Sequence, residues 1–259
     1  MAALTILNPE SLNEIETQLR YAKDRDFFHR VWSKHQSVYQ DRLKALGFEN
    51  LDQILDAGCG YGQWSLALAA LNRSVIGIDI DEERVETAKK VAKLAEVTNI
   101  SFKSGSVENP LLKAESLDAI FSYGVIFLTD FRKTLRCFHR LLKPQGKLYF
   151  SANGLGWYLY NLIDEHKPSE DFSPRQMAID ALGNSIRYYA TGEHEFGKSL
   201  VIGMDVVEEE SVKAGFSILA KGPEGTINLK PGLTIHPFYP DAEKYGHDNI
   251  YELLCQKPY

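Results

Sequence analysis

The stretch ILDAGCGYGQWSLALA, residues 54–69, decides the fold expected for this chain. It begins as a short apolar run, passes through three glycines at every second position, and continues with helix-forming residues. Gly58, Gly60 and Gly62 have no β-carbon, so they allow a tight strand-to-helix turn in which the backbone comes close to a ligand. In an open α/β sheet, ligands bind outside the carboxyl ends of the strands. The stretch therefore predicts a ligand site at the end of the first strand.

Apolar runs and helical patterns alternate along the chain from this point. We expect strands at 53–58, 74–80, 99–105, 116–123 and 146–152, and helices at 63–71, 82–96 and 130–142. Pro144 is expected to halt the last of these helices, and Asp81 to cap the second. This alternation predicts an α/β fold with a parallel sheet that is covered on both faces.

The flanking segments follow other patterns. Asn8-Pro9 predicts the start of a first helix, and a second helical stretch from Phe28 ends at Gly47. Residues 153–203 break the alternation and are rich in aromatic residues, whereas Asp205 is expected to cap a late helix that ends at Gly215. We expect four regions: an N-terminal helical cap (1–50), a ligand-binding core (51–152), an inserted substrate cap after the fifth strand (153–203), and a C-terminal helix and strands that complete the sheet (204–259).

The residues around the glycines indicate which ligand binds. A dinucleotide fingerprint needs glycine at the sixth position from Gly58, where this chain has Gln63. Asp56 stands just before the glycines, where a carboxylate suits an ammonium group better than a phosphate. Asp79 lies about 20 residues after the turn, where an acidic residue accepts hydrogen bonds from ribose hydroxyls. S-adenosylmethionine has an amino-acid head, a sulfonium and no phosphate, and it fits this pattern.

Residues 50–152 resemble the class I, Rossmann-like S-adenosylmethionine-dependent methyltransferases of the small-molecule type. The glycine run is similar to the family's first motif, D-x-G-C-G-x-G, and SVIGIDI (74–80) is similar to its ribose motif. The segments SGSVENPLLKAESLDAIFSYGVIFLTD and RCFHRLLKPQGKLYFSA resemble its later motifs. The resemblance implies a seven-stranded, mostly parallel Rossmann-like sheet between helices. It also implies S-adenosylmethionine as the cofactor and S-adenosylhomocysteine as the product.

The resemblance assigns roles to ten cofactor-binding residues. They are Asp56, Gly58, Cys59 and Gly60 around the methionine part, Asp79 at the ribose, Ile80, Ser106 and Val107 at the adenine, and Ser122 and Tyr123 on the methionine side facing the substrate. The family usually has an acidic residue where Ser106 stands. A serine hydroxyl can accept the bond from the adenine amino group only more weakly.

The substrate side has no obligatory signature, because methyl transfer mainly requires proximity and alignment, and only some acceptors need a general base. The catalytic residues are therefore unassigned, with His166, His194 and Tyr123 as candidates. The candidates for substrate contact are Trp157, Tyr158, Tyr188, His194, His236 and Tyr239. An aromatic insert favours a small organic acceptor. The spacing of Glu165-His166 and His194-Glu195 matches no standard metal site, so no metal is expected.

Composition restricts the partners. The net charge of −6 and the absence of a basic run argue against a nucleic-acid partner. The three cysteines are widely spaced, which indicates neither disulfides nor zinc and favours a reducing, cytoplasmic setting. The N-terminus does not resemble a signal peptide, and no apolar run reaches the roughly 20 residues of a membrane span. The oligomeric state is not fixed by these patterns.

The sequence thus predicts an enzyme that methylates O, N or C of a small metabolite in biosynthesis, for example in secondary metabolism. Three alternatives stay open. An RNA or protein methyltransferase would need a basic groove or an Asn/Asp-Pro-Pro-Tyr/Phe motif, where SYGVIF stands. A binding protein that keeps the fold without catalysis is disfavoured by the intact Gly58, Gly60, Gly62 and Asp79, because a dead site has no need for them. A nicotinamide oxidoreductase is disfavoured by Gln63.

Overall fold

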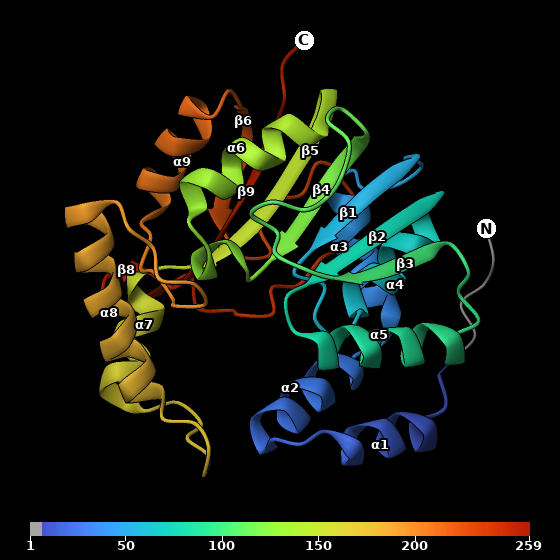
Figure 1. Ribbon diagram of the computed structural model, residues 1–259, viewed down its shortest axis with the longest axis horizontal. Coiled ribbons are helices and arrows are strands. Elements are labelled where there is room, and N and C mark those ends of the chain that lie inside the picture. The colour runs from blue at the N-terminus through green and yellow to red at the C-terminus, as the bar shows by residue number, and fades with distance from the viewer. Residues whose placement is uncertain (1–6) are drawn as a thin grey trace. The chain divides into compact units, whose positions relative to one another are not determined.

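A seven-stranded sheet in the order β3-β2-β1-β4-β5-β9-β6 dominates the computed structural model, which describes residues 7–259 (Figure 1). Its strands are β1 (Gln53–Ala57), β2 (Ser74–Asp79), β3 (Ile100–Ser104), β4 (Leu117–Tyr123), β5 (Leu142–Asn153), β6 (Ser217–Pro223) and β9 (Ile250–Gln256). β1 pairs in parallel with β2, β2 with β3, and β4 with β5, whereas β9 runs antiparallel to β5 and to β6. The predicted seven-stranded, mostly parallel α/β fold is confirmed.

The chain forms two compact units. Among the described residues, the first comprises 7–110, 169–172 and 228–235 and contains β1, β2 and β3. Its helices are α1 (Pro9–Gln18), α2 (Ala22–Trp32), α3 (Gln36–Ala45), α4 (Gln63–Leu71) and α5 (Glu82–Leu94). Within this unit, α5 packs on β2 and β3, and α1 and α2 lie beyond α5 (Figure 1).

Local sequence signals account for the ends of these helices. The Asn8 side chain accepts a hydrogen bond from the Glu10 N–H, and the Asp81 side chain accepts one from the Arg84 N–H, as both predicted caps require. The stretch that follows Phe28 is two helices rather than one. His35 accepts a hydrogen bond from the Ser37 N–H and so caps a new helix, α3.

The second unit comprises residues 111–168, 173–227 and 236–259 and contains β4, β5, β6 and β9. It also contains a short 3₁₀ helix (Ile126–Leu128), the helices α6 (Phe131–Leu141), α7 (Leu155–Asp164), α8 (Pro174–Thr191) and α9 (Met204–Lys213), and the hairpin of β7 (Glu243–Lys244) and β8 (His247–Asp248). The aromatic-rich insert is thus largely helical, and α7 and α8 pack together within it (Figure 1). The division into four regions with boundaries at residues 50, 152 and 203 remains a prediction.

Of two local expectations for this unit, one was confirmed and one was wrong. Helix α6 ends at Leu141, before Pro144 as predicted, and Pro144 itself lies inside β5, where the pairing with β4 shifts from Leu117↔Leu142 to Ala119↔Lys147. A proline is tolerated at such a bulge because its missing N–H removes no ladder hydrogen bond. The N-cap of α9 is Gly203, and Asp205 lies in the first turn, where a carboxylate still favours the helix N-terminus. Gly215 follows the helix end with φ 101°, as expected.

None of the helices within residues 7–259 has the length and apolar character that a membrane span requires.

Candidate functional site

The glycine-rich turn joins β1 to α4 in the first unit. Gly58, Gly60 and Gly62 all have positive φ, at 80°, 52° and 84°. Residues other than glycine rarely adopt a backbone conformation with positive φ. The N–H groups of Gly58 and Cys59 donate to the Ile78 carbonyl oxygen at 2.7 and 3.0 Å. The turn is therefore fixed against β2, with its backbone bent as the sequence predicted.

Gly62 also makes room for a neighbouring helix. A β-carbon at this position would lie 3.1 Å from the Ala88 β-carbon and 3.3 Å from the Phe102 ring. By contrast, a β-carbon at Gly60 would meet only Phe27, at 3.8 Å. Gly62 thus allows close packing on α5, whereas the buried Gly60 has room for a β-carbon and is required by its positive φ.

Asp79 lies at the end of β2 and is nearly buried, with 8% of its surface exposed. Its Oδ2 accepts a hydrogen bond from the Gly60 N–H at 2.8 Å, and its Oδ1 accepts one from the Asp81 N–H at 3.0 Å. An ionised carboxylate has about four acceptor positions. The two backbone donors orient this carboxylate while leaving it able to accept further hydrogen bonds from a ligand.

Asp56 lies in β1 just before the turn and is fully buried. Its Oδ2 accepts a hydrogen bond from the Ser65 hydroxyl at 2.5 Å. Burial raises the pKa of this carboxyl, the Ser65 hydrogen bond lowers it and the charge of Asp79 raises it, and the net result is a pKa of about 7. Two carboxyl groups beside one turn favour a ligand that is positively charged or rich in hydrogen-bond donors.

The buried polar atoms without a hydrogen-bond partner in the described chain include Gln63 Oε1, in the first turn of α4 in the first unit, and Ser122 Oγ, near the end of β4 in the second unit. Such orphaned atoms are rare in native proteins and call for a partner from water or a ligand. Gly124, which follows β4, would have open space around an added β-carbon. In the first unit, the two carboxyl groups and the amide oxygen beside the glycine turn fit a ligand with an amino group, hydroxyls and no phosphate.

The remaining predicted cofactor residues lie at or after strand ends of the first unit. Ile80 follows β2 and is 53% exposed. Val107 is buried, and Ser106 Oγ accepts a hydrogen bond from the Glu108 N–H at 3.2 Å. Cys59 is buried, and burial raises the pKa of its thiol, so Cys59 is a packing residue of the turn rather than a nucleophile.

Tyr123, at the end of β4 in the second unit, is partly buried and belongs to a hydrogen-bonded cluster. Its hydroxyl donates to Glu224 Oε1 at 2.9 Å, and Glu224 is 1% exposed. Glu224 Oε2 accepts hydrogen bonds from the N–H groups of Phe238 and Tyr239 at 2.9 and 3.2 Å. The Phe238 ring meets the Tyr123 ring edge-on with centroids 6.1 Å apart. The cluster thus brings the predicted residues Tyr123 and Tyr239 together through a glutamate that the sequence analysis missed.

A second missed carboxylate, Glu252 of β9, supports the same region. It is completely buried, and its Oε2 accepts a hydrogen bond from the Tyr149 hydroxyl at 2.7 Å. Its Oε1 accepts from the N–H groups of Thr226 and Ile227 at 2.9 and 2.7 Å. The signal was present in the sequence, because Glu252 is the one charged residue within the apolar run IYELLC. A lone charge in a buried strand indicates a satisfied buried carboxylate.

The other substrate and catalytic candidates lie at different depths in the second unit. Tyr158 and Tyr188 are buried, and their hydroxyls donate to the Leu200 carbonyl at 3.1 Å and to Asp130 Oδ1 at 2.9 Å. The partly buried Trp157 lies edge-on to Tyr158.

The three histidine candidates lie nearer the surface. His166 and His236 are exposed, and His194 Nε2 lies 2.8 Å from the Lys198 carbonyl oxygen. The roles of all these residues in substrate binding or catalysis stay predictions.

Residues 7–259 contain no group of three or more histidine, cysteine or acidic side chains arranged to hold a metal ion. Cys59, Cys137 and Cys255 are buried free thiols.

Comparisons with known proteins agree with this geometry. A family model described as a methyltransferase domain matches residues 48–191, which is more than half of the chain. A demethylmenaquinone methyltransferase of Staphylococcus epidermidis is 30% identical over 122 residues, which cover 46% of this chain and 47% of that protein. A ubiquinone biosynthesis O-methyltransferase of Bartonella quintana is 26% identical over 162 residues, covering 62% and 59%. The chain spans about half the length of the curated relatives it matches.

The fold is also found among solved structures. An S-adenosylmethionine-dependent methyltransferase from Clostridium acetobutylicum superposes with a TM-score of 0.61 at 14% identity, over 92% of this chain and 99% of that one. At this identity the likeness shows a shared fold.

Proposed function

The chain belongs to the class I S-adenosylmethionine-dependent methyltransferases, and from this premise we propose that it methylates a small organic metabolite. The observation that carries the proposal is the glycine turn flanked by Asp56 and Asp79, with Asp79 held by the Gly60 amide at 2.8 Å. The acceptor atom can be O, N or C.

In this proposal the first unit binds most of the cofactor. Asp79 accepts hydrogen bonds from the ribose hydroxyls, and Asp56 balances the ammonium group of the methionine part. Gly58, Cys59 and Gly60 let the backbone approach that part closely. The exposed Ile80 and the buried Val107 flank the adenine, and Ser106 accepts from its amino group.

When bound, S-adenosylmethionine supplies a methyl group already activated by its sulfonium. The residues of the chain then have to orient the acceptor and exclude water. We assign Ser122 to the methionine side and Tyr123 to the acceptor side. Because the Tyr123 proton is committed to Glu224, the Tyr123 oxygen keeps lone pairs that can accept a hydrogen bond from an acceptor O–H.

We propose an aromatic or phenol-like acceptor as the substrate class. Two relatives carry names that refer to demethylmenaquinone and to ubiquinone biosynthesis. The rings of Tyr123 and Phe238 offer an apolar surface beside the polar Tyr123–Glu224 pair, a combination typical of small-molecule sites. Trp157, Tyr158, Tyr188, His194, His236 and Tyr239 remain candidates for substrate contact, and His166 and His194 remain candidates for acid–base roles.

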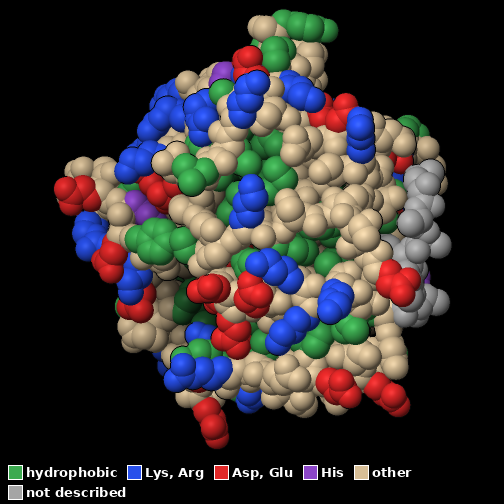
Figure 2. All heavy atoms as spheres, turned by 45° about the vertical axis from the view of Figure 1, so that its right-hand side comes forward, with side chains coloured by type: hydrophobic (Ala, Val, Ile, Leu, Met, Phe, Trp, Pro, Cys, Tyr) green, Lys and Arg blue, Asp and Glu red, His purple; other side chains and the backbone are tan. Residues whose placement is uncertain are grey.

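A nucleic-acid or protein substrate is the weaker proposal. The net charge is −6, and on the face seen in Figure 2 basic and acidic side chains are interspersed. Phosphate binding requires clustered positive charge. We propose a cytoplasmic setting, which the three free thiols support.

The test is a release assay for S-adenosylhomocysteine with S-adenosylmethionine and an acceptor panel of catechols, hydroxybenzoates, amines and total RNA. The proposal expects product with a phenolic acceptor and none with RNA. Product with RNA alone would overturn the small-molecule assignment. Binding of S-adenosylhomocysteine without turnover of any acceptor would favour a non-catalytic S-adenosylmethionine-binding protein.

A further inference from the structure

The first unit contains a cavity of about 720 Å³ that takes no part in the proposed cofactor site. It is bounded by α1, α2, the first turn of α3, Leu66 of α4 and Ala95, the residue after α5. Sites for small molecules usually measure about 300–1,000 Å³. None of the residues assigned to the cofactor lines this cavity. It is therefore large enough for an organic ligand and distinct in its residues from the cofactor site.

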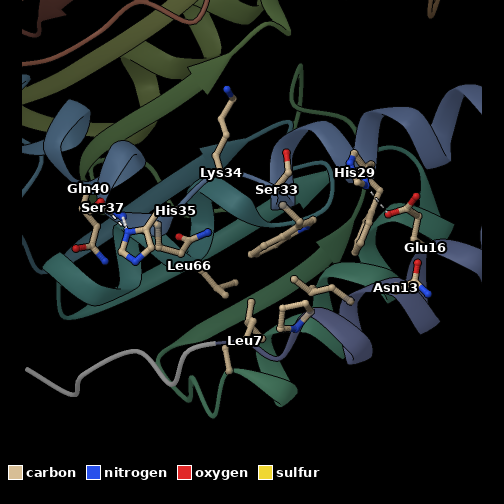
Figure 3. Close-up of a pocket in the computed structure, with 16 residues that line it drawn as sticks. Leu7, Asn13, Glu16, His29, Ser33, Lys34, His35, Ser37, Gln40 and Leu66 are labelled. Carbon is tan, nitrogen blue, oxygen red and sulfur yellow. Dashed lines mark hydrogen bonds and ion pairs between the residues drawn. The ribbon is translucent and has the colours of Figure 1, made fainter.

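The walls of the cavity combine an apolar centre with polar ends. Leu7, Leu12, Phe28 and Leu66 contribute apolar surface. Figure 3 shows the ion pair of His29 and Glu16 (3.1 Å) at one end, and His35 with its neighbours Ser37 and Gln40 at the other. An apolar body with a polar head matches this distribution.

Hydrogen-bond donors at the α2–α3 junction have no protein partner. Trp32 is 7% exposed, and its indole N–H is buried and unpartnered within residues 7–259. The side-chain amide of Gln36, which also lines the cavity, has neither its nitrogen nor its oxygen satisfied. A buried donor without an acceptor pays the full loss of hydration, so a ligand that supplies acceptors gains that free energy on binding.

His35 adds a donor to the same end. Its Nδ1 accepts a hydrogen bond from the Ser37 N–H at 3.3 Å, where it caps α3. In the neutral imidazole the proton then resides on Nε2, which acts as a donor. Indole, amide and imidazole N–H groups together favour an anionic head with several acceptor oxygens.

We propose that this cavity is a second ligand site of the first unit, for a small amphipathic acid with an apolar body and a carboxylate or sulfonate head. The head accepts hydrogen bonds from Trp32, Gln36 and His35, and the body lies against Leu12, Phe28 and Leu66. Phe28 separates the two sites: it lines the cavity, and its ring also meets Tyr61 of the glycine turn edge-on at 5.3 Å. The site is independent of the proposed methyl transfer.

The probe is 1-anilinonaphthalene-8-sulfonate, which has an aromatic body and a sulfonate head. Titration of the full chain is followed by energy transfer from tryptophan, because Trp32 lies in the cavity wall. We expect saturation at one equivalent. Trp32→Phe should weaken binding about threefold to tenfold through loss of one donor, and Leu12→Trp, which fills the cavity, should weaken it at least tenfold.

Two controls keep the result interpretable. Tyr245→Phe changes an exposed aromatic residue of the second unit and should leave the affinity for the probe unchanged. Each variant must still bind S-adenosylhomocysteine within about threefold of the parent, which shows that the first unit is folded. No saturable binding by the parent, or equal binding by the parent and a folded Leu12→Trp variant, would overturn the proposal. If Leu12→Trp fails to fold, Trp32→Phe decides by the same criterion.

Discussion

The glycine turn of the first unit and the Tyr123–Glu224 cluster of the second unit are assembled in different ways. In the first unit, Asp79 reaches back only 19 residues to the Gly60 amide, and every part of the turn lies between residues 56 and 81. In the second unit, Tyr123 and Glu224 are 101 residues apart, and Tyr149 and Glu252 are 103 apart. The proposed cofactor site is one local motif and can be read from a sequence, whereas the proposed acceptor site joins segments that are far apart in the chain.

The largest effect is expected at Asp79. Asp79→Ala removes the carboxylate that we assign to the ribose and also the acceptor that holds the Gly60 amide. Each charge-assisted hydrogen bond contributes about 1.5–3 kcal/mol, so affinity for S-adenosylhomocysteine should fall by about two to three orders of magnitude by calorimetry. Asp81→Ala removes a helix cap and a 3.6 Å ion pair with Arg84 but no side chain assigned to the cofactor, and it is the matched control. A folded Asp79→Ala protein with unchanged affinity would refute the ribose assignment.

A smaller effect, on rate rather than cofactor affinity, is expected at Tyr123. Tyr123→Phe removes the hydroxyl bonded to Glu224 and should lower kcat with a phenolic acceptor by about tenfold to a hundredfold. Affinity for S-adenosylhomocysteine should change less than threefold. Tyr245→Phe, which loses a surface hydroxyl bonded to Asp164, should be neutral. Equal losses of cofactor affinity and rate in Tyr123→Phe would remove the distinction between the two regions.

A pH dependence of about tenfold is expected from Asp56. The pKa of this carboxyl is raised to about 7 by burial, and only the ionised form attracts an ammonium group. Affinity for S-adenosylhomocysteine should therefore fall about tenfold from pH 8 to pH 6. Asp56→Asn should abolish the dependence, and a parent protein with a flat profile would contradict the assignment.

The raised pKa of Asp56 also predicts how the stability of the ligand-free protein changes with pH. A folded-state pKa above the unfolded value stabilises the fold below about pH 4, and this contribution is lost as the pH rises through 7. In Asp56→Asn the free energy of unfolding should fall less over that range than in the parent, as urea titrations at several pH values can measure.

The smallest effect is expected where α2 meets α5. Asp24 and Arg84 pair at 2.8 Å, and the Arg84 guanidinium lies 5.6 Å from the centroids of the Phe27 and Tyr61 rings. Asp24→Ala should cost about 1 kcal/mol or less and weaken S-adenosylhomocysteine binding a few-fold at most. Lys89→Ala, which breaks the exposed pair with Glu86, should have no effect. A hundredfold loss in Asp24→Ala would mean that α2 contributes directly to the cofactor site.

The features of the fold that could be predicted from the sequence are the local ones, and those that could not be predicted depend on pairing between distant segments. The caps at Asn8 and Asp81, the positive-φ glycines and the strands of the core follow from local rules of backbone conformation. The helices α7 and α8 were not predicted, because their aromatic residues and Gly183 obscure a helical pattern. The bulge at Pro144 depends on its pairing with β4, which no local signal encodes.

The residues of the candidate site also fall into those that local sequence spacing identifies and those that only the folded chain reveals. Asp56 and Asp79 were identified from spacing alone, and the structure places both beside the glycine turn. Glu224 was missed because its sequence context, GPEG at 222–225, is typical of an exposed turn. The Glu224 carboxylate is nevertheless buried and accepts hydrogen bonds from the N–H groups of Phe238 and Tyr239. Burial of a polar side chain by a distant loop is a tertiary property, and it becomes visible only in the folded chain.

The central claim is that the glycine turn between Asp56 and Asp79 binds S-adenosylmethionine. Calorimetric titration of the purified protein with S-adenosylhomocysteine, in parallel with NAD, tests it most directly. The account predicts saturable micromolar binding of S-adenosylhomocysteine and no binding of NAD. Binding of NAD alone would contradict it.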